Sequence, residues 1–187
     1  MLAKTKSYAL YGLTGFRVDV EVDVSSGLPG FDIVGLPDTA VKESKERVRS
    51  AIKNSGMRYP NAKITVNLAP ADLKKQGAYL DLAIAVGILK AGQSGLKDNV
   101  DEYAFIGELS LDGKIRSVTG LLPMLISAKN DGSKKIIIPT ENVKEIDGGS
   151  RPVRCHFQRS IFGEIVSLCL NRNRNCLMKR QQTLPRS

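Results

Sequence analysis

The chain has 187 residues, which is enough for one domain with a buried core and only marginally enough for two. Its apolar fraction of 42% is ordinary for a globular protein, Trp is absent and aromatic residues make up 5%. The overall composition therefore suggests neither a disordered chain nor a fibrous architecture, and an aliphatic core is expected. All three cysteines lie in the last 33 residues, which excludes a disulfide framework for the rest of the chain.

The net charge of +9 is concentrated near the C-terminus. Residues 1–147 contain 20 basic and 18 acidic side chains, whereas residues 148–187 contain 8 basic and 1 acidic. A nearly balanced domain has no long-range attraction for phosphate on its own. We therefore expect one domain at residues 1–147, followed at residues 148–187 by a basic, cysteine-containing and partly disordered tail.

Compartment and metal content follow from a few local features. No stretch reaches the roughly 18 apolar residues of a membrane span and the N-terminus lacks a secretory signal, so we expect a cytoplasmic protein with no membrane partner. Cys155 adjoins His156, but their spacing to Cys169 and Cys176 fits no common zinc pattern. Free thiols are therefore favoured over a metal site, and no cofactor is expected.

The first third of the chain predicts three strands. Residues 17–24 alternate four valines with four charged residues, which indicates a strand with one buried and one exposed face. Shorter β-prone runs at residues 8–10 and 31–34 flank it, separated by glycines and a proline. Together these runs predict an antiparallel meander.

A helix is predicted between Asp38, a good N-terminal cap, and Gly56, which suits a C-terminal cap. One face is apolar and the other is charged, with Glu43 four residues before Arg47. The favoured interpretation of the charged face is a solvated surface supported by ion pairs one turn apart, and phosphate contact is the alternative. Its members are Lys42, Glu43, Lys45, Glu46, Arg47, Arg49 and Lys53.

A second amphipathic strand is predicted at residues 62–68, ending before Pro70. A loop then leads to a helix at residues 78–91 that is apolar on nearly all sides, so it is expected to be the central helix of the core. Asp81 lies in the first turn of this helix, where a carboxylate is favoured by the helix dipole.

The second half predicts a hairpin of residues 103–111 and 114–118, with its turn at Asp112-Gly113. A helix at residues 121–130 and a strand at residues 135–139 follow. This order of helices and strands predicts an α/β two-layer sandwich with a mixed sheet. In the tail, Ser160 is expected to cap a short helix, and the last residues, 171–187, are expected to be disordered.

Motifs with catalytic meaning are absent from the 187 residues. There is no GxxxxGK[ST] loop for nucleotide phosphates, and no HExxH, GxSxG or GxGxxG pattern. The only histidine is His156 in the tail, so the core offers no Ser-His-Asp arrangement. A Ser-Lys dyad is the remaining nucleophile option.

Residues 107–120 (GELSLDGKIRSVTG) and 135–142 (KIIIPTEN) resemble Lon-type protease domains. The resemblance implies a Lon-protease-like fold, which is also that of ribosomal protein domain 2. At the positions of the catalytic serine and lysine of those proteases this chain has Tyr79 and Leu122. Leucine can neither take nor give a proton, so the dyad is lost and a Lon-like peptidase is disfavoured.

A longer resemblance covers residues 10–142. The strings GLPGFDIVGLPDTAVKESKERVRSAI at residues 27–52 and ITVNLAPADLKKQG at residues 64–77 are similar to the N-terminal domain of the ComM and magnesium-chelatase-like (YifB-type) AAA+ family. The resemblance implies hexameric, ATP-driven motors that act on DNA in branch migration during natural transformation. After residue 147 the chain departs from the family pattern, which indicates a short paralogue or a truncated or frameshifted reading frame.

The expected function is a non-catalytic accessory domain of a ComM-like DNA-remodelling ATPase, packed beside copies of itself in a ring and binding DNA weakly when alone. Lys74 and Lys75 are the candidate phosphate contacts, because their loop ends at Gly77 before a helix N-terminus, where N–H groups favour anions. The alternatives are a stand-alone nucleic-acid binder acting through the basic tail, and the disfavoured Lon-like peptidase.

Overall fold

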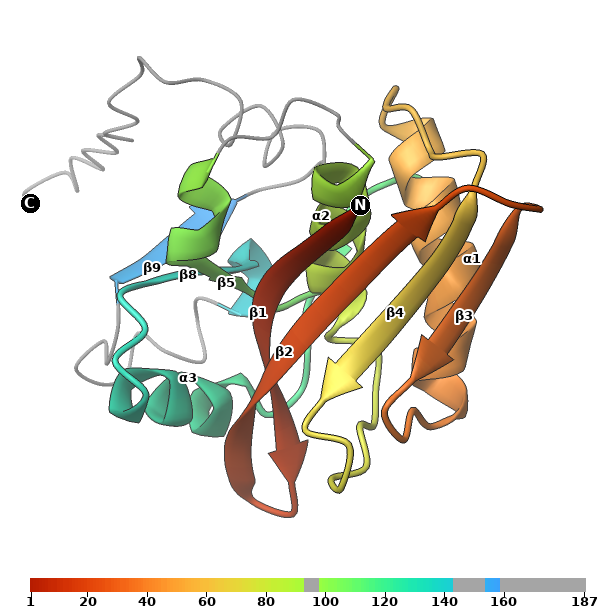
Figure 1. Ribbon diagram of the computed structural model, residues 1–187. Coiled ribbons are helices and arrows are strands. Elements are labelled where there is room, and N and C mark those ends of the chain that lie inside the picture. Colours follow the sequence, from red (N-terminus) through yellow and green to blue (C-terminus); the bar gives the residue numbers. More distant parts are fainter. Residues whose placement is uncertain (93–97, 143–153, 159–187) are drawn as a thin grey trace, which may run out of the picture.

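The computed structural model describes residues 1–92, 98–142 and 154–158 (Figure 1). Their main feature is a seven-stranded mixed sheet in the order β3-β4-β2-β1-β5-β8-β9. The strands are β1 (Leu2–Tyr11), β2 (Thr14–Ser25), β3 (Gly30–Val34), β4 (Lys63–Ala69), β5 (Tyr103–Phe105), β8 (Lys135–Pro139) and β9 (Arg154–Gln158).

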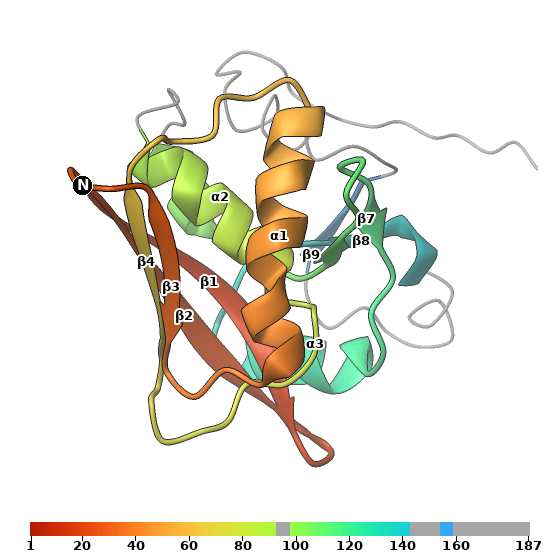
Figure 2. The same cartoon turned by 90° about the vertical axis from the view of Figure 1, so that its right-hand side faces the viewer.

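Helices α1 and α2 cover one face of the β3-β4-β2-β1 part of this sheet, and α3 lies at the end of the β1–β2 hairpin (Figures 1 and 2). The described chain is therefore a mixed α/β structure, as the sequence predicts. The remaining elements are helices α1 (Thr39–Asn54), α2 (Asp81–Ala91) and α3 (Leu121–Asn130), the paired strands β6 (Glu108–Leu109) and β7 (Ile115–Arg116), and the 3₁₀ turns η1 (Asp98–Glu102) and η2 (Thr140–Asn142).

Strand β2 has the two faces that its alternation predicts. Val18, Val20 and Val22 are fully buried, whereas Asp19 and Glu21 between them are partly exposed. The antiparallel β1 partner begins at Leu2, well before the predicted run at residues 8–10. Its first half alternates lysines with small residues that carry no strong apolar signal, so the sequence pattern did not reveal it.

Strand β3 corrects the predicted meander. It pairs with β4 in parallel, with Gly30 opposite Lys63 and Val34 opposite Asn67, and β4 separates it from β2. Helix α1 lies between β3 and β4 in the chain and provides the crossover that a parallel pair requires. The sheet edge at β3 therefore lies beside α1 (Figure 1).

Helix α2 is the central helix of the core, as predicted. Every residue of it except Lys90 is buried. It packs on β1 and β2, where Val22 Cγ2 lies 2.7 Å from the position that a Cβ on Gly87 would occupy. The buried hydroxyl group of Thr5 in β1, beneath the helix, has a hydrogen-bond partner, because Thr5 Oγ1 donates to the Ala83 carbonyl at 2.9 Å. The sheet, α1 and β6 surround α2, which explains its apolar character on nearly all sides.

The predicted strand at residues 103–111 is split between two sheets. Its first part, β5, pairs in parallel with β1 and β8, and the chain then leaves the main sheet at Gly107. Strands β6 and β7 form the hairpin expected around Asp112-Gly113, and Gly113 has the positive φ of +84° that such a turn requires. Helix α3 and strand β8 match their predictions.

Strand β9 pairs with β8 in parallel, beyond the predicted domain limit at residue 147. The helix predicted after Ser160 and the disorder predicted at residues 171–187 lie outside the described residues.

Gly35, between β3 and α1, gives a test of this packing. Its φ is +94°, and a Cβ there would lie 2.2 Å from the Leu68 carbonyl oxygen. Gly35→Ala is expected to lower the free energy of unfolding by about 1–2 kcal/mol, because alanine disfavours the left-handed backbone. The clash of its Cβ with the Leu68 carbonyl oxygen should lower it by a further ~1–3 kcal/mol. Gly12→Ala is the matched control, because Gly12 has φ of +61° and open space around its Cβ position. Urea unfolding followed by circular dichroism measures the stability of both variants. Equal losses of stability would contradict the close approach of Gly35 to the Leu68 carbonyl.

Candidate nucleic-acid interface

The loop between β4 and α2 carries the two lysines proposed for phosphate contact. Lys74 is exposed, whereas Lys75 has no accessible surface. The Lys75 ammonium donates to the Pro70 carbonyl, and burial lowers its pKa. Its main chain is also engaged, because Lys75 N donates to the Leu36 carbonyl at 3.1 Å and the Lys75 carbonyl accepts from Asp38 N at 2.9 Å. Only Lys74 therefore presents its side chain to solvent in this structure.

The N-terminus of α2, expected to favour anions behind this loop, is already satisfied by the protein. Leu82 N donates to the Gly107 carbonyl at 3.1 Å, and Gly77 N donates to Asp38 Oδ2 at 3.2 Å. The first residue of the helix, Asp81, is itself a fully buried carboxylate. The helix terminus thus does not strengthen phosphate binding at this loop.

Asp81 forms the best-defined polar contact of the core, with Arg47 of α1. Arg47 Nε donates to Asp81 Oδ2 at 2.6 Å and Arg47 Nη2 donates to Asp81 Oδ1 at 3.1 Å. Leu109 N of β6 also donates to Asp81 Oδ2, at 3.2 Å, and Arg47 Nη2 reaches the Ala40 carbonyl at 2.8 Å. The predicted pairing of Arg47 with Glu43 is wrong, because the ion-pair partner of Arg47 is Asp81. Asp81 lies in the first turn of α2, as predicted, and is bound by this side chain as well.

Burial raises the pKa of Asp81 to about 6, against the opposing effect of Arg47. The carboxyl group therefore remains ionised at neutral pH. The neighbouring carboxylate holds the pKa of Arg47 above its ordinary value, so this partner is charged as well. A bidentate arginine is the side chain that best satisfies a buried carboxylate. No local sequence pattern indicates this pairing, because Arg47 and Asp81 are 34 positions apart in the chain.

The positions that correspond to the protease dyad carry no proton-transfer pair. The Tyr79 phenol oxygen accepts from Leu10 N at 3.4 Å, and burial raises the pKa of the phenol. Leu122 is an apolar side chain, 41% exposed on α3. Leu10 occupies the space between Tyr79 and the start of α3, since its Cδ1 lies 2.5 Å from where a Cβ on Gly120 would stand. These two positions offer neither an activated nucleophile nor its base.

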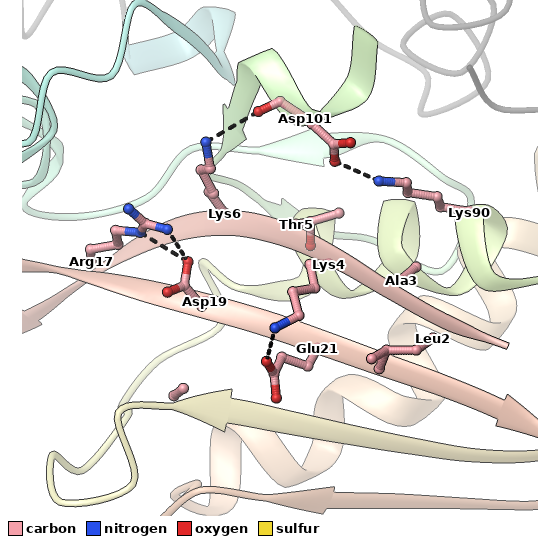
Figure 3. Close-up of a pocket in the computed structure, with 11 residues that line it drawn as sticks. Leu2, Ala3, Lys4, Thr5, Lys6, Arg17, Asp19, Glu21, Lys90 and Asp101 are labelled. Atoms are coloured by element: carbon pink, nitrogen blue, oxygen red, sulfur yellow. Dashed lines mark hydrogen bonds and ion pairs between the residues drawn. The ribbon is translucent and has the colours of Figure 1, made fainter. Parts of the chain in front are cut away.

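The outer face of β1 and β2 forms a charged hollow of about 580 Å³ (Figure 3). Three of its four cations form ion pairs with carboxylates and the fourth, Lys6, is held by a main-chain carbonyl, so the hollow has little attraction left for a phosphate. The contacts are Lys4 Nζ to Glu21 at 2.6 Å, Arg17 Nη2 to Asp19 at 2.6 Å, Lys90 to Asp101, and Lys6 Nζ to the Asp101 carbonyl at 3.2 Å.

Residues 20–142 match the family model described as subunit ChlI of Mg-chelatase. The chain belongs to this family. Within it, the chain is 43% identical to the competence protein ComM of Haemophilus influenzae over 144 residues, which are 77% of this chain and 28% of ComM. It is 47% identical to YifB of Escherichia coli over 138 residues, which are 74% of this chain and 27% of YifB.

Lon protease 2 of Bacillus subtilis is a more distant relative, 35% identical over 161 residues, with 75% of this chain and 29% of the protease covered. The resemblance to ComM and YifB expected from the sequence is thus confirmed. The chain spans less than a third of the length of each of these relatives.

The described part of this ChlI-family chain contains neither a cluster of metal ligands nor a helix that could span a membrane. No group of three or more His, Cys, Asp or Glu residues there is placed to hold a metal ion. Within the same residues, none of the helices combines the length and apolar character needed to cross a membrane. The candidate zinc ligands of the sequence are not among the side chains that the structure describes; they are Cys155, His156, Cys169 and Cys176.

The Arg47–Asp81 pair predicts a large effect on stability. Arg47→Met is expected to lower the free energy of unfolding by about 3–5 kcal/mol, because it leaves the Asp81 charge buried without its partner. Lys42→Met, an exposed position on the same helix, is expected to change it by less than about 0.5 kcal/mol. Denaturant unfolding at pH 7 measures both, and similar values for the two variants would show that the pair is not essential.

Proposed function

We propose that this ChlI-family chain is a non-catalytic accessory domain of a ComM-like, ATP-driven machine that remodels DNA in the cytoplasm. The observation that carries the proposal is the 43% identity to ComM over 144 residues. The printed sequence contains no GxxxxGK[ST] loop, so the ATPase activity would come from another module. The likeness to Lon protease 2 supports a Lon-like fold for the domain.

In this proposal the domain packs beside further copies of itself in a ring and helps to position DNA. Lys74 contributes a phosphate contact from an exposed loop. Lys75, the second residue predicted for this role, supports the proposal less, since its ammonium is buried against Pro70. A single exposed lysine implies weak binding by the isolated chain.

The purified chain is expected neither to bind nor to hydrolyse ATP. Nucleotide triphosphates are held by a phosphate-cradling loop with a lysine and a magnesium ligand, and the sequence contains no such motif. Isothermal titration with Mg-ATP measures binding, and phosphate release measures turnover. Magnesium-dependent turnover that persists through two unrelated purification schemes would contradict the non-catalytic assignment.

Lys74→Gln is expected to weaken DNA binding by the full chain to a similar extent for all sequences, because phosphate contacts carry no base information. The slope of log affinity against log salt should fall by about 0.7–0.9 for the one lost contact. Fluorescence anisotropy over a salt series measures both quantities. Lys129→Gln, another exposed lysine, is the charge-matched control, and an identical slope in the two variants would remove Lys74 from the interface.

A further inference from the structure

A second hollow, of about 340 Å³, lies at the end of the sheet where α1 finishes and β3 and β4 begin. Residues of α1 form one wall, the start of β3 forms another, and the loop from α1 to β4 closes the end. We call it the α1 hollow. The lining residues used below are Phe31, Lys45, Glu46, Arg49, Lys53 and Tyr59.

The three cations of the α1 hollow form a row along the helix. Lys45, Arg49 and Lys53 are four residues apart, so each lies about 6 Å further along the axis than the one before it. This separation is comparable to that of neighbouring phosphates in an extended nucleic-acid strand. Lys53 lies in the last turn, where its charge also offsets the negative end of the helix dipole.

The charges of this row are available to a ligand. All three side chains are exposed, and none of them forms an ion pair with a residue whose side chain the structure describes. Glu46 is the single acidic residue of the lining. The hollow on the outer face of β1 and β2 differs, because Lys4, Arg17 and Lys90 each have a carboxylate partner there. The α1 hollow is therefore the more electropositive of the two.

The α1 hollow also presents aromatic surface beside these charges. The Arg49 guanidinium lies 5.9 Å from the centroid of the half-buried Tyr59 ring, and the half-buried Phe31 also lines the hollow. Burial raises the pKa of Tyr59 to about 12, so the phenol stays neutral. Planar aromatic and guanidinium groups stack on nucleobases, whereas an acidic peptide uses the guanidinium charge and makes no use of the aromatic surface.

We infer that the α1 hollow binds a short stretch of single-stranded nucleic acid. Lys45, Arg49 and Lys53 contact successive phosphates, and Tyr59 stacks on a base. The hollow, of about 340 Å³, has room for a single base beside the row of cations, and the phosphates lie along α1. This inference rests on the proposed DNA-handling function and assigns it a site distinct from Lys74.

The test measures binding of a fluorescein-labelled 12-nucleotide oligothymidylate by the full chain, using anisotropy over a salt series. Lys45→Gln/Arg49→Gln should weaken binding at least tenfold and lower the salt slope by about 1.4, or 0.7 for each lost contact. Tyr59→Leu should weaken binding about tenfold with no change in slope, because stacking releases no counterions. The charge-matched control Lys129→Gln/Lys134→Gln changes two exposed lysines away from the hollow and should stay within threefold of the parent.

Photocrosslinking with bromodeoxyuridine in the same strand locates the site directly, and a crosslink at Tyr59 is expected. If the chain binds the strand but both hollow variants behave like the control, or crosslinks occur only in residues 148–187, the α1 hollow is not the site while DNA handling stands. Equal displacement of the strand by an oligoglutamate of matched charge, or a preference for duplex, would also overturn the site. If no DNA binds at low salt, the DNA-handling function fails together with it.

Discussion

The Arg47–Asp81 pair joins three elements that are distant in the sequence. Arg47 belongs to the middle of α1, Asp81 begins α2, and Leu109 N of β6 supplies a further hydrogen bond to the same carboxylate. Removing a carboxylate from water costs several kcal/mol unless its partners are correctly placed. The charge is therefore satisfied only when α1, α2 and the β6–β7 hairpin hold their observed positions, which fixes the rotation of α1 about its own axis.

That rotation determines which side of α1 faces solvent. Residues two positions apart on a helix point in directions that differ by about 200°. Because Arg47 points inward, Lys45 and Arg49 point outward, beside the start of β3. The partly buried ion pair thus acts with the buried apolar face of α1 to set both the packing of the helix on the core and the display of the cationic row.

Local patterns predicted much of the fold. The valine alternation of β2, the apolar α2, the Asp112-Gly113 turn and the bounds of α3 and β8 all depend on residues close together in the chain. The parallel pairing of β3 with β4 depends instead on a crossover through α1, and no local pattern distinguishes it from a meander. The early start of β1 was missed because small residues, and not large apolar ones, fill its inner face.

The candidate site was harder to predict for the same reason. A loop lysine is usually solvated, and the burial of Lys75 results from contacts with Pro70 and the segment before α1. The four-residue spacing of Lys45, Arg49 and Lys53 was visible in the sequence, and the usual meaning of such a row is a solvated face. What distinguishes it is Tyr59, brought beside Arg49 only when the loop after α1 folds back.

Charge is distributed unevenly over a domain whose sequence is nearly balanced. The carboxylates of Asp19, Glu21 and Asp101 neutralise lysines and an arginine on the outer face of the sheet, which leaves the α1 row as an electropositive surface. A single domain that makes only a few phosphate contacts binds nucleic acid weakly. In the proposed ring of domains, a strand that leaves one hollow would be captured by the next at a high effective concentration. Weak binding by each copy then permits movement along the strand, which tight binding by one domain would prevent.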